Sequence, residues 1–426
     1  MNISVQGGNV LSGEIFPSGS KNSAVSLIPA TILFDRPVTL HNIPDITDVV
    51  RLVRIMEKLG SNITWDEQAK SMTIDNSHLR FEDLDKDDLG NMKGTSLLWG
   101  PMLSRFKQVK FEDLPGGCTL GVRSLDAHYE AFKKFGVTIQ DDQKRAHMDA
   151  SKAKATTIWL TEMSPSATAN CIMLSVSLAG TTTLINAASE PQVQDLCTFL
   201  VKCGADIQGI GSSTLIITGG KDLHPVEHTL LTDHLEVITF LALAAATGGN
   251  ITVHHAHPEL FGHIETTFRQ FAIPLIYKGD SISIEKGTCV QLPPSKTTTV
   301  RAQPWPSLPV DALPLFIPLA LSAPHGQVLF HNWMYESALF WTSELTKLGG
   351  NIIICDPHRV IVHGGNKLHG ATLEAPYIIR ATVALAMAAM IAEGESIILN
   401  ADTLYRGHPD FAKNLRSLGA DITEIP

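Results

Sequence analysis

The most constraining feature of this 426-residue chain is a short pattern that recurs six times along it. In five copies an apolar residue and a glycine end an expected helix and a short apolar strand follows, as in KLGSNITW at residues 58–65; in the degraded copy Ala272 takes the place of the glycine. The marker positions lie 68 to 77 residues apart, at Gly60, Gly136, Gly204, Ala272, Gly349 and Gly419. Six copies therefore cover the whole chain, which is too long for one compact core.

A second marker precedes each helix end: an apolar strand that closes on a polar turn, as in VTLHNIPD at residues 38–45. The next segment has apolar residues at helical spacing, including Val49, Val53 and Met56. Each unit is therefore expected to be a strand, a helix and further strands, and two groups of three units would make two similar domains. Two runs that are apolar nearly all round, residues 237–246 and 381–392, predict helices buried inside these domains.

Composition excludes several classes of function. The chain has 33 Lys and Arg against 43 Asp and Glu, a formal net charge of −10, and no basic cluster that would bind a phosphate backbone. The first residues, MNISVQGG, have no signal-peptide pattern, and the apolar runs are shorter than a membrane span of about 20 residues. Six cysteines without a CxxC pair favour neither a disulfide scaffold nor a zinc knuckle. We expect a cytoplasmic protein without nucleic-acid or membrane partners.

The segment 18–22, SGSKN, is the first candidate for chemistry. Small residues let a ligand approach the backbone, and Lys21 can act as a point charge for phosphate. The alternative is an ordinary turn with a solvated lysine. The same letters also match the S-x-x-K nucleophile pattern of Ser-Lys hydrolases, with Ser18 as nucleophile, but neither K-T-G nor S-D-N follows downstream.

The second candidate is the segment PGGC at residues 115–118, followed by Arg123. A double glycine after proline predicts a loop that reaches the surface, and Arg123 could favour the thiolate of Cys118 or hold an anion. The alternative is a turn with an incidental cysteine. The combination of glycines, cysteine and arginine in one loop favours a reactive thiol.

Charged residues near the repeat boundaries form the third candidate, with surface salt bridges as the alternative for each of them. They are Glu190, Asp233, Asp311, Arg380 and Arg406. Arg380 lies at the start of an expected apolar helix, and Arg406 lies in a turn before the last expected helix of the chain, so either could direct its guanidinium into a cleft between the domains. A fourth candidate is a histidine group, His254, His255, His257 and His263, in which strand alternation would place the second and third on one face as a metal pair.

Several segments together resemble the enolpyruvyl transferase family over the full length of the chain. They are GSKN at 19–22, PGGCTLGVRSLDAH at 115–128, SATAN at 166–170, AASEPQVQD at 187–195, the segment around Asp311, and YRGH at 405–408. The cysteine loop with its arginine is similar to the branch of the family that acts on UDP-N-acetylglucosamine in peptidoglycan precursor synthesis. The branch of the shikimate pathway shares the early lysine but lacks this loop.

The resemblance implies an α/β (α+β) fold class with two inside-out α/β barrel domains of three βαβ-type repeats each. It implies that residues 21–231 form one domain and that residues 1–20 with 232–426 form the other. The active site is then expected in the cleft between the domains, where closure around the substrate excludes water.

The implied reaction transfers the enolpyruvyl group of phosphoenolpyruvate to the 3-hydroxyl of UDP-N-acetylglucosamine and releases phosphate. It proceeds by addition to a tetrahedral ketal and then elimination. By resemblance, Cys118 is the general acid at the methylene carbon and can capture phosphoenolpyruvate or the drug fosfomycin covalently. Asp311 takes the proton from the sugar hydroxyl.

The remaining implied roles concern binding. Lys21 and Arg123 hold the phosphate, and Arg380 and Arg406 hold the carboxylate. The residues implied to contact or support the acceptor are Asn22, Lys93, Ser124, Leu125, Asp126, Ser164, Pro165, Ser166, Thr168, Glu190 and Asp233. The resemblance implies no metal and no cofactor, small-molecule substrates as the partners, and a monomer or weak oligomer.

Four positions depart from the family's pattern. Lys93 and His234 stand where the family has arginine, Ala338 replaces another arginine, and Ile378 replaces an acid two residues before Arg380. These changes leave the phosphoenolpyruvate pocket largely whole and affect the acceptor side. Two alternatives follow: transfer to a different nucleotide or nucleotide sugar in specialised metabolism, or a non-catalytic paralogue that binds a nucleotide sugar.

Overall fold

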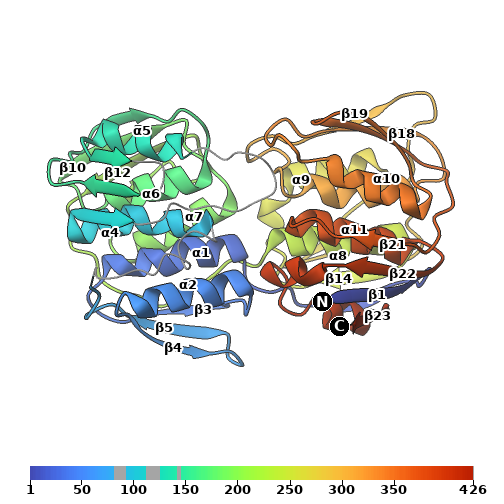
Figure 1. The fold of residues 1–426 in the computed structure, drawn as a ribbon, viewed down its shortest axis with the longest axis horizontal. Helices are drawn as coiled ribbons and strands as arrows, with labels where there is room; N and C mark the ends of the chain where they lie inside the picture. The colour runs from blue at the N-terminus through green and yellow to red at the C-terminus, as the bar shows by residue number, and fades with distance from the viewer. Residues whose placement is uncertain (81–92, 112–124, 142–144, 426) are drawn as a thin grey trace. The chain divides into compact units, whose positions relative to one another are not determined.

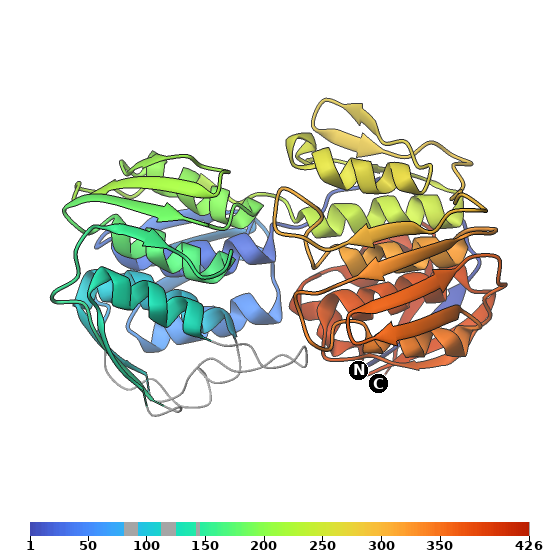
Figure 2. The same cartoon turned by 90° about the horizontal axis from the view of Figure 1, so that it is seen from above.

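The computed structural model describes residues 1–80, 93–111, 125–141 and 145–425, and contacts divide the chain into two compact units (Figure 1, Figure 2). We call the described residues between 19 and 231 the N-terminal unit, and residues 1–18 with 232–425 the C-terminal unit. Within these described ranges, every helix is too short or too polar to cross a membrane.

The described residues of the N-terminal unit form three sheets with one recurring order. In spatial order they are β13 (His228–Thr229), β3 (Val38–His41), β5 (Ser71–Asp75) and β4 (Asn62–Asp66); β6 (Gln108–Phe111), β8 (Ala146–Asp149) and β7 (Thr138–Asp141); and β9 (Thr157–Trp159), β10 (Gly180–Ile185), β12 (Thr214–Gly219) and β11 (Asp206–Gln208). In each sheet a hairpin folds back so that its second strand pairs antiparallel with the strand that began the repeat. The three sheets are therefore copies of one topology.

The C-terminal unit repeats this topology in three four-stranded sheets. They are β2 (Ser12–Ile15), β14 (Asn250–Val253), β16 (Ser281–Ser283) and β15 (Ile276–Lys278); β17 (Thr298–Arg301), β18 (Gln327–His331), β20 (Arg359–His363) and β19 (Asn351–Asp356); and β21 (Thr372–Glu374), β22 (Gly394–Leu399), β1 (Asn2–Gly7) and β23 (Asp421–Ile425). In the last sheet the chain start supplies the missing strand, because β1 pairs antiparallel with both β22 and β23.

Each unit has its most apolar helices inside and its sheets outside (Figure 1). The inner helices are α1 (Lys21–Ala30), α4 (Trp99–Phe106) and α6 (Pro165–Ser175) in the N-terminal unit, and α8 (His234–Thr247), α10 (Ile317–Ser322) and α11 (Ile379–Ile391) in the C-terminal unit. The two runs predicted to be buried helices lie in α8 and α11, and this prediction is confirmed. A helix that is apolar on every side gains most when other helices and a sheet surround it.

The outer helices are amphipathic and cover the inner ones together with the sheets. They are α2 (Thr47–Lys58), α5 (Asp126–Phe135), α7 (Pro191–Lys202), α9 (Gly262–Gln270) and α12 (Phe411–Ser417), with the 3-10 helix η5 (Phe340–Leu348) in the equivalent place of its repeat. Shorter 3-10 segments are η1 (Thr31–Leu33), η2 (Lys93–Leu98), η3 (Pro258–Leu260), η4 (Leu313–Phe316) and η6 (Ala401–Arg406). In α2 the apolar face, including Leu52 and Met56, is fully buried.

The six repeat markers share one backbone conformation. Their φ angles are 96° at Gly60, 93° at Gly136, 104° at Gly204, 58° at Ala272, 89° at Gly349 and 97° at Gly419. At every copy the marker's N–H bonds to the carbonyl three residues back, and the next N–H bonds to the carbonyl five residues back from itself. This is a left-handed cap that glycine adopts without a Cβ penalty. The six-fold repeat predicted from the sequence is confirmed.

Candidate active site

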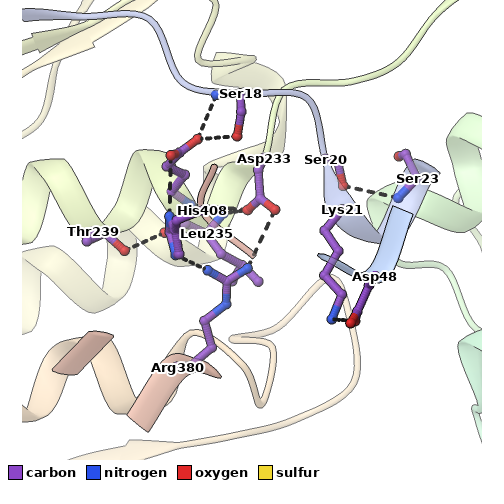
Figure 3. Close-up of polar contacts among 11 residues, drawn as sticks. Ser18, Ser20, Lys21, Ser23, Asp48, Asp233, Leu235, Thr239, Arg380 and His408 are labelled. Carbon is purple, nitrogen blue, oxygen red and sulfur yellow. Dashed lines mark hydrogen bonds and ion pairs between the residues drawn. The ribbon is translucent and has the colours of Figure 1, made fainter. Parts of the chain in front are cut away.

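Arg380 is a deeply buried cation of the C-terminal unit. It is the second residue of α11 and only 6% exposed, because the run that follows it, residues 381–390, is apolar and packs inside the unit. A guanidinium at this end of a helix faces the positive end of the helix dipole and needs acceptors. Its Nη2 lies 3.5 Å from Oδ2 of Asp233, and its Nη1 lies 2.6 Å from Nε2 of His408 (Figure 3).

Asp233 caps α8 and balances the charge of Arg380. Its Oδ1 accepts hydrogen bonds from the backbone N–H groups of Leu235 and Glu236, at 2.9 and 3.1 Å. Burial is the largest single influence and would raise the pKa of Asp233, but the Arg380 charge, together with smaller contributions from neighbouring groups, holds the pKa below the ordinary value of 3.8. Asp233 is therefore an ionised counter-ion.

His408 connects Arg380 to a second buried carboxylate. Its Nδ1 lies 3.3 Å from Oε1 of Glu236, whose Oε2 accepts from the backbone N–H and the hydroxyl of Ser18 at 2.6 and 2.7 Å. His408 and Glu236 have no exposed surface. The contacts thus run from Ser18 through Glu236 and His408 to Arg380, and we call these four residues the buried relay.

His234 starts α8 beside the same charges. Its ring packs edge-on against Trp305, with centroids 5.9 Å apart. Burial lowers the pKa of His234 below 6.5; Asp233 and Asp311 act to raise it, and Arg380 acts to lower it further. His234 is therefore neutral at neutral pH. Asp311 is half-buried in the turn before η4 and is near enough for its charge to act on His234. Three residues predicted for the site, Asp233, Asp311 and Arg380, therefore lie near the start of α8.

Arg406 is the last residue of η6 and lies over an aromatic ring. Its guanidinium carbon is 4.7 Å from the ring centroid of Tyr377, which precedes α11. A cation on an aromatic face at a partly exposed site is held by about 0.5–1 kcal/mol. Tyr377 lies three residues before Arg380, and His408 lies two residues after Arg406. The contact with Tyr377 therefore brings Arg406 close to the segment that carries Arg380.

Lys21 is the first residue of α1 in the N-terminal unit. Ser20 caps this helix by accepting from the N–H of Ser23, and Asn22 follows Lys21 in the first turn. The Nζ of Lys21 lies 2.8 Å from Oδ2 of Asp48 on α2, and both side chains are largely buried (Figure 3). Asp48 therefore fixes the ammonium group.

The start of α6 carries a polar cluster in the same unit. Ser164 caps the helix, and Pro165 takes the first helical position, where a missing N–H costs nothing. The hydroxyl of Ser166 lies 3.1 Å from Nε2 of His128, whose Nδ1 is 3.0 Å from Nδ2 of Asn170. The carbonyl oxygen of the Asn170 amide accepts from the backbone N–H of residue 100, so this cluster also joins α6 to α4.

Other residues predicted for the acceptor lie at further helix starts. Leu125 precedes α5 and is half-buried, and Asp126 is its exposed first residue. Glu190 is the N-cap residue of α7. Thr168 is fully buried, and its hydroxyl accepts from the N–H of Ala188 at 3.0 Å.

Several predicted residues lie outside the described part of the chain. Cys118, Arg123 and Ser124 fall in the range 112–124, which the structure does not describe. Lys93 is described as the first residue of η2, without its side chain. Their roles in the site therefore remain predictions.

The two alternative chemistries are not favoured by the geometry. The Ser18 hydroxyl donates to Glu236, and Lys21 pairs with Asp48, so the two members of the S-x-x-K pattern have separate partners. His255 and His257 follow β14 rather than lying in it, and each bonds to a carboxylate, Asp280 and Glu259. Across the residues that the structure describes, no group of three or more His, Cys, Asp or Glu could hold a metal ion.

Three of the four departures from the family's pattern have described side chains. His234 is a buried neutral ring, Ala338 is buried in the core, and Ile378 is a partly buried residue packed against that core. Ile378 is also the N-cap of α11 and makes no side-chain cap. The position two residues before Arg380 thus supplies no proton-transfer group.

Sequence reasoning missed the partners of the predicted cations: His408, Glu236 and Asp48. His408 lies in the recognised YRGH segment, and Glu236 lies three residues after the predicted residue Asp233. Their pairing joins residues 172 positions apart, which sequence spacing alone does not reveal.

Comparison with known proteins gives consistent matches over the whole chain. Residues 5–415 match the family model described as EPSP synthase (3-phosphoshikimate 1-carboxyvinyltransferase). The chain is 38% identical to the UDP-N-acetylglucosamine 1-carboxyvinyltransferase of Bacteroides thetaiotaomicron, covering 99% of both chains, and 36% identical to the enzyme of the same name from Bradyrhizobium diazoefficiens, covering 99% of this chain and 97% of the other. Its fold is similar to the crystal structure of the enolpyruvyl transferase NikO from Streptomyces tendae, with a TM-score of 0.86, 24% identity, and coverage of 99% and 98%.

Proposed function

The chain belongs to the EPSP synthase family of enolpyruvyl transferases, and we propose that it transfers the enolpyruvyl group of phosphoenolpyruvate to the 3-hydroxyl of UDP-N-acetylglucosamine. Phosphate is the second product. The observation that carries this proposal is identity of 36–38% over nearly the full length of relatives that bear the name of this activity. The product is a peptidoglycan precursor, and we expect the reaction to take place in the cytoplasm.

The proposed chemistry has two steps. In the addition, a proton is added to the methylene carbon of phosphoenolpyruvate while the sugar oxygen attacks the neighbouring carbon and loses its own proton. In the elimination, the C–O bond to phosphate breaks and the methyl group gives up a proton, which restores the double bond. We assign Cys118 as the acid of the first step and Asp311 as the base for the sugar hydroxyl.

The cationic side chains supply the binding part of the proposal. Arg380 keeps its charge in a water-poor environment, where attraction to a substrate carboxylate is stronger than in bulk water. Arg406 is assigned to the same carboxylate, and Lys21 with Arg123 to the phosphate. The helix starts of α5 and α6, with Ser164 to Thr168, are assigned to the nucleotide.

The test measures phosphate release from phosphoenolpyruvate with and without UDP-N-acetylglucosamine, before and after treatment with fosfomycin. We expect release that depends on the acceptor and is abolished by the drug, with a covalent adduct at Cys118 detected by mass spectrometry. Cys118→Ser should lose the adduct, whereas the control Cys289→Ser, which removes an exposed thiol elsewhere, should keep it. Absence of acceptor-dependent release would contradict the proposal.

A second candidate is transfer to another nucleotide or nucleotide sugar. The apolar Ile378 before Arg380 favours it, because this position offers no carboxylate to the acceptor side. The same assay with a panel of uridine nucleotides separates the two. Turnover of UDP-N-acetylglucosamine alone would exclude the second candidate.

A further inference from the structure

We propose that His408 is a positioning residue that holds the Arg380 guanidinium in the orientation needed to bind the substrate carboxylate. This inference rests on the proposed function, in which Arg380 binds the carboxylate of phosphoenolpyruvate. It concerns a histidine that is absent from the set predicted from the sequence.

The contact between the two side chains fixes the protonation of the histidine. Nη1 of Arg380 lies 2.6 Å from Nε2 of His408, and both groups are buried. A guanidinium has donors but no acceptor, so Nε2 must carry no proton and must accept. The proton of the neutral ring is then on Nδ1, which faces Oε1 of Glu236 at 3.3 Å.

Glu236 is in turn fixed from the opposite side. Its other oxygen accepts two hydrogen bonds from Ser18, one from the backbone N–H and one from the hydroxyl. The ring of His408 also packs edge-on against Phe411, with centroids 5.6 Å apart. The relay therefore draws on four separate segments of the C-terminal unit, and the histidine cannot rotate without breaking a buried polar contact.

A neutral acceptor has an advantage over a second carboxylate at this place. Asp233 already provides one negative charge to the guanidinium, and another anion on Nη1 would cancel the attraction for a substrate carboxylate. The imidazole orients the guanidinium without adding charge to it. These two contacts use two of the five N–H donors of Arg380, which leaves donors for the ligand.

The test compares His408→Gln, whose amide can accept from Arg380, with His408→Leu, which cannot. We expect His408→Leu to raise the KM for phosphoenolpyruvate by at least about tenfold, the cost of a lost charge-assisted hydrogen bond, and to leave the KM for UDP-N-acetylglucosamine nearly unchanged. His408→Gln should keep most of the affinity for phosphoenolpyruvate. A matched control is His358→Leu, a half-buried histidine of the same unit that bonds to a backbone carbonyl outside the relay.

Two further measurements separate this inference from the proposed function. Absence of turnover with UDP-N-acetylglucosamine would overturn the proposed function alone. The affinity for phosphoenolpyruvate, measured by calorimetry on the wild type and the His408 variants, would still decide the role of His408. Nitrogen-15 NMR of the wild-type protein near neutral pH should find the His408 proton on Nδ1, with the signal assigned by its loss in His408→Gln.

The inference is overturned by any of three results: a proton on Nε2, unchanged affinity for phosphoenolpyruvate in folded His408→Leu, or equal loss for both substrates.

Discussion

At the scale of single residues, the cost of burying Arg380 explains why its neighbours are so polar. Removing one partner from a buried ion pair costs about 3–5 kcal/mol, since the remaining charge has neither water nor a counter-ion. Asp233 supplies the counter-ion, and His408 supplies a neutral acceptor. The side chains that prepare the site for an anion therefore also stabilise the C-terminal unit.

His234 should make stability depend on pH. Burial lowers its pKa below 6.5, so the unfolded chain takes up a proton at a higher pH than the folded chain does. The contribution to stability is therefore full above pH 6.5 and is lost as the pH falls further. We expect His234→Phe, which keeps the contact with Trp305, to reduce the loss of stability between about pH 7 and 5.5 by about 1 kcal/mol.

Urea unfolding at both pH values measures this effect. The control His325→Phe removes an exposed histidine from the same unit. Equal pH dependence in the wild type and His234→Phe would contradict the prediction.

The cysteines should differ sharply in reactivity. Burial raises the pKa of Cys171 and of Cys197 to about 12, so neither forms a thiolate near neutral pH. Cys289 and Cys355 are exposed. We expect iodoacetamide to label Cys289 and Cys355 in the native protein and to reach Cys171 and Cys197 only after denaturation, as followed by peptide mass spectrometry. Rapid native labelling of Cys171 would contradict this assignment.

The sequence predicts the location of Arg380 better than it predicts the side chains that contact and orient it. An apolar run after Arg380 indicates that the residue starts a buried helix, because the pattern is local. His408 and Glu236 meet only through the packing of α8 and α11 and the segment after η6, so their contact depends on the tertiary fold. Local patterns carry no information on such a pairing.

At the scale of elements, the left-handed cap is the most predictable part of the fold. Glycine at five of the six marker positions follows from the positive φ that the cap requires. Ala272 adopts φ 58° in the sixth copy and keeps the same pair of backbone hydrogen bonds. The hydrogen-bonding pattern therefore persists at a local energetic cost of about 1 kcal/mol.

Ala272→Gly should therefore stabilise the C-terminal unit by roughly 1 kcal/mol, because the left-handed backbone no longer strains a Cβ. Gly419→Ala is the matched control with the opposite sign, since a Cβ there would meet its nearest neighbour at an ordinary 3.7 Å and only the backbone strain is tested. Thermal unfolding of both variants measures the change. A lower Tm for Ala272→Gly would show that its methyl group contributes more by packing than it costs in strain.

At the scale of the whole molecule, some of the sheets contain a strand from a distant part of the chain as well as the strands of their own repeat. The sequence predicts six similar units, but the sixth sheet is completed by β1, from the opposite end of the chain, and the first repeat receives β13 from beyond the third. The repeat pattern does not predict these pairings, because a short strand such as β13, with two residues, has no periodic signal. They close each unit on itself, so the ends of a unit depend on each other for folding.

This closure predicts that β1 matters more than its position at the chain start suggests. β1 lies between β22 and β23 and pairs with five residues of each, whereas β23 is an edge strand of the same sheet. Deletion of residues 2–7 would remove the antiparallel partner of β22, which keeps β21, and would leave β23 without its described partner. It would also remove the buried apolar side chains of Ile3 and Val5, each worth about 1.5–3 kcal/mol. We expect this deletion to make the C-terminal unit sensitive to limited proteolysis while fragments of the N-terminal unit survive. Deletion of residues 421–426, the matched control, removes one ladder of backbone pairing instead of two and should lower the Tm less; equal losses would contradict a central role for β1.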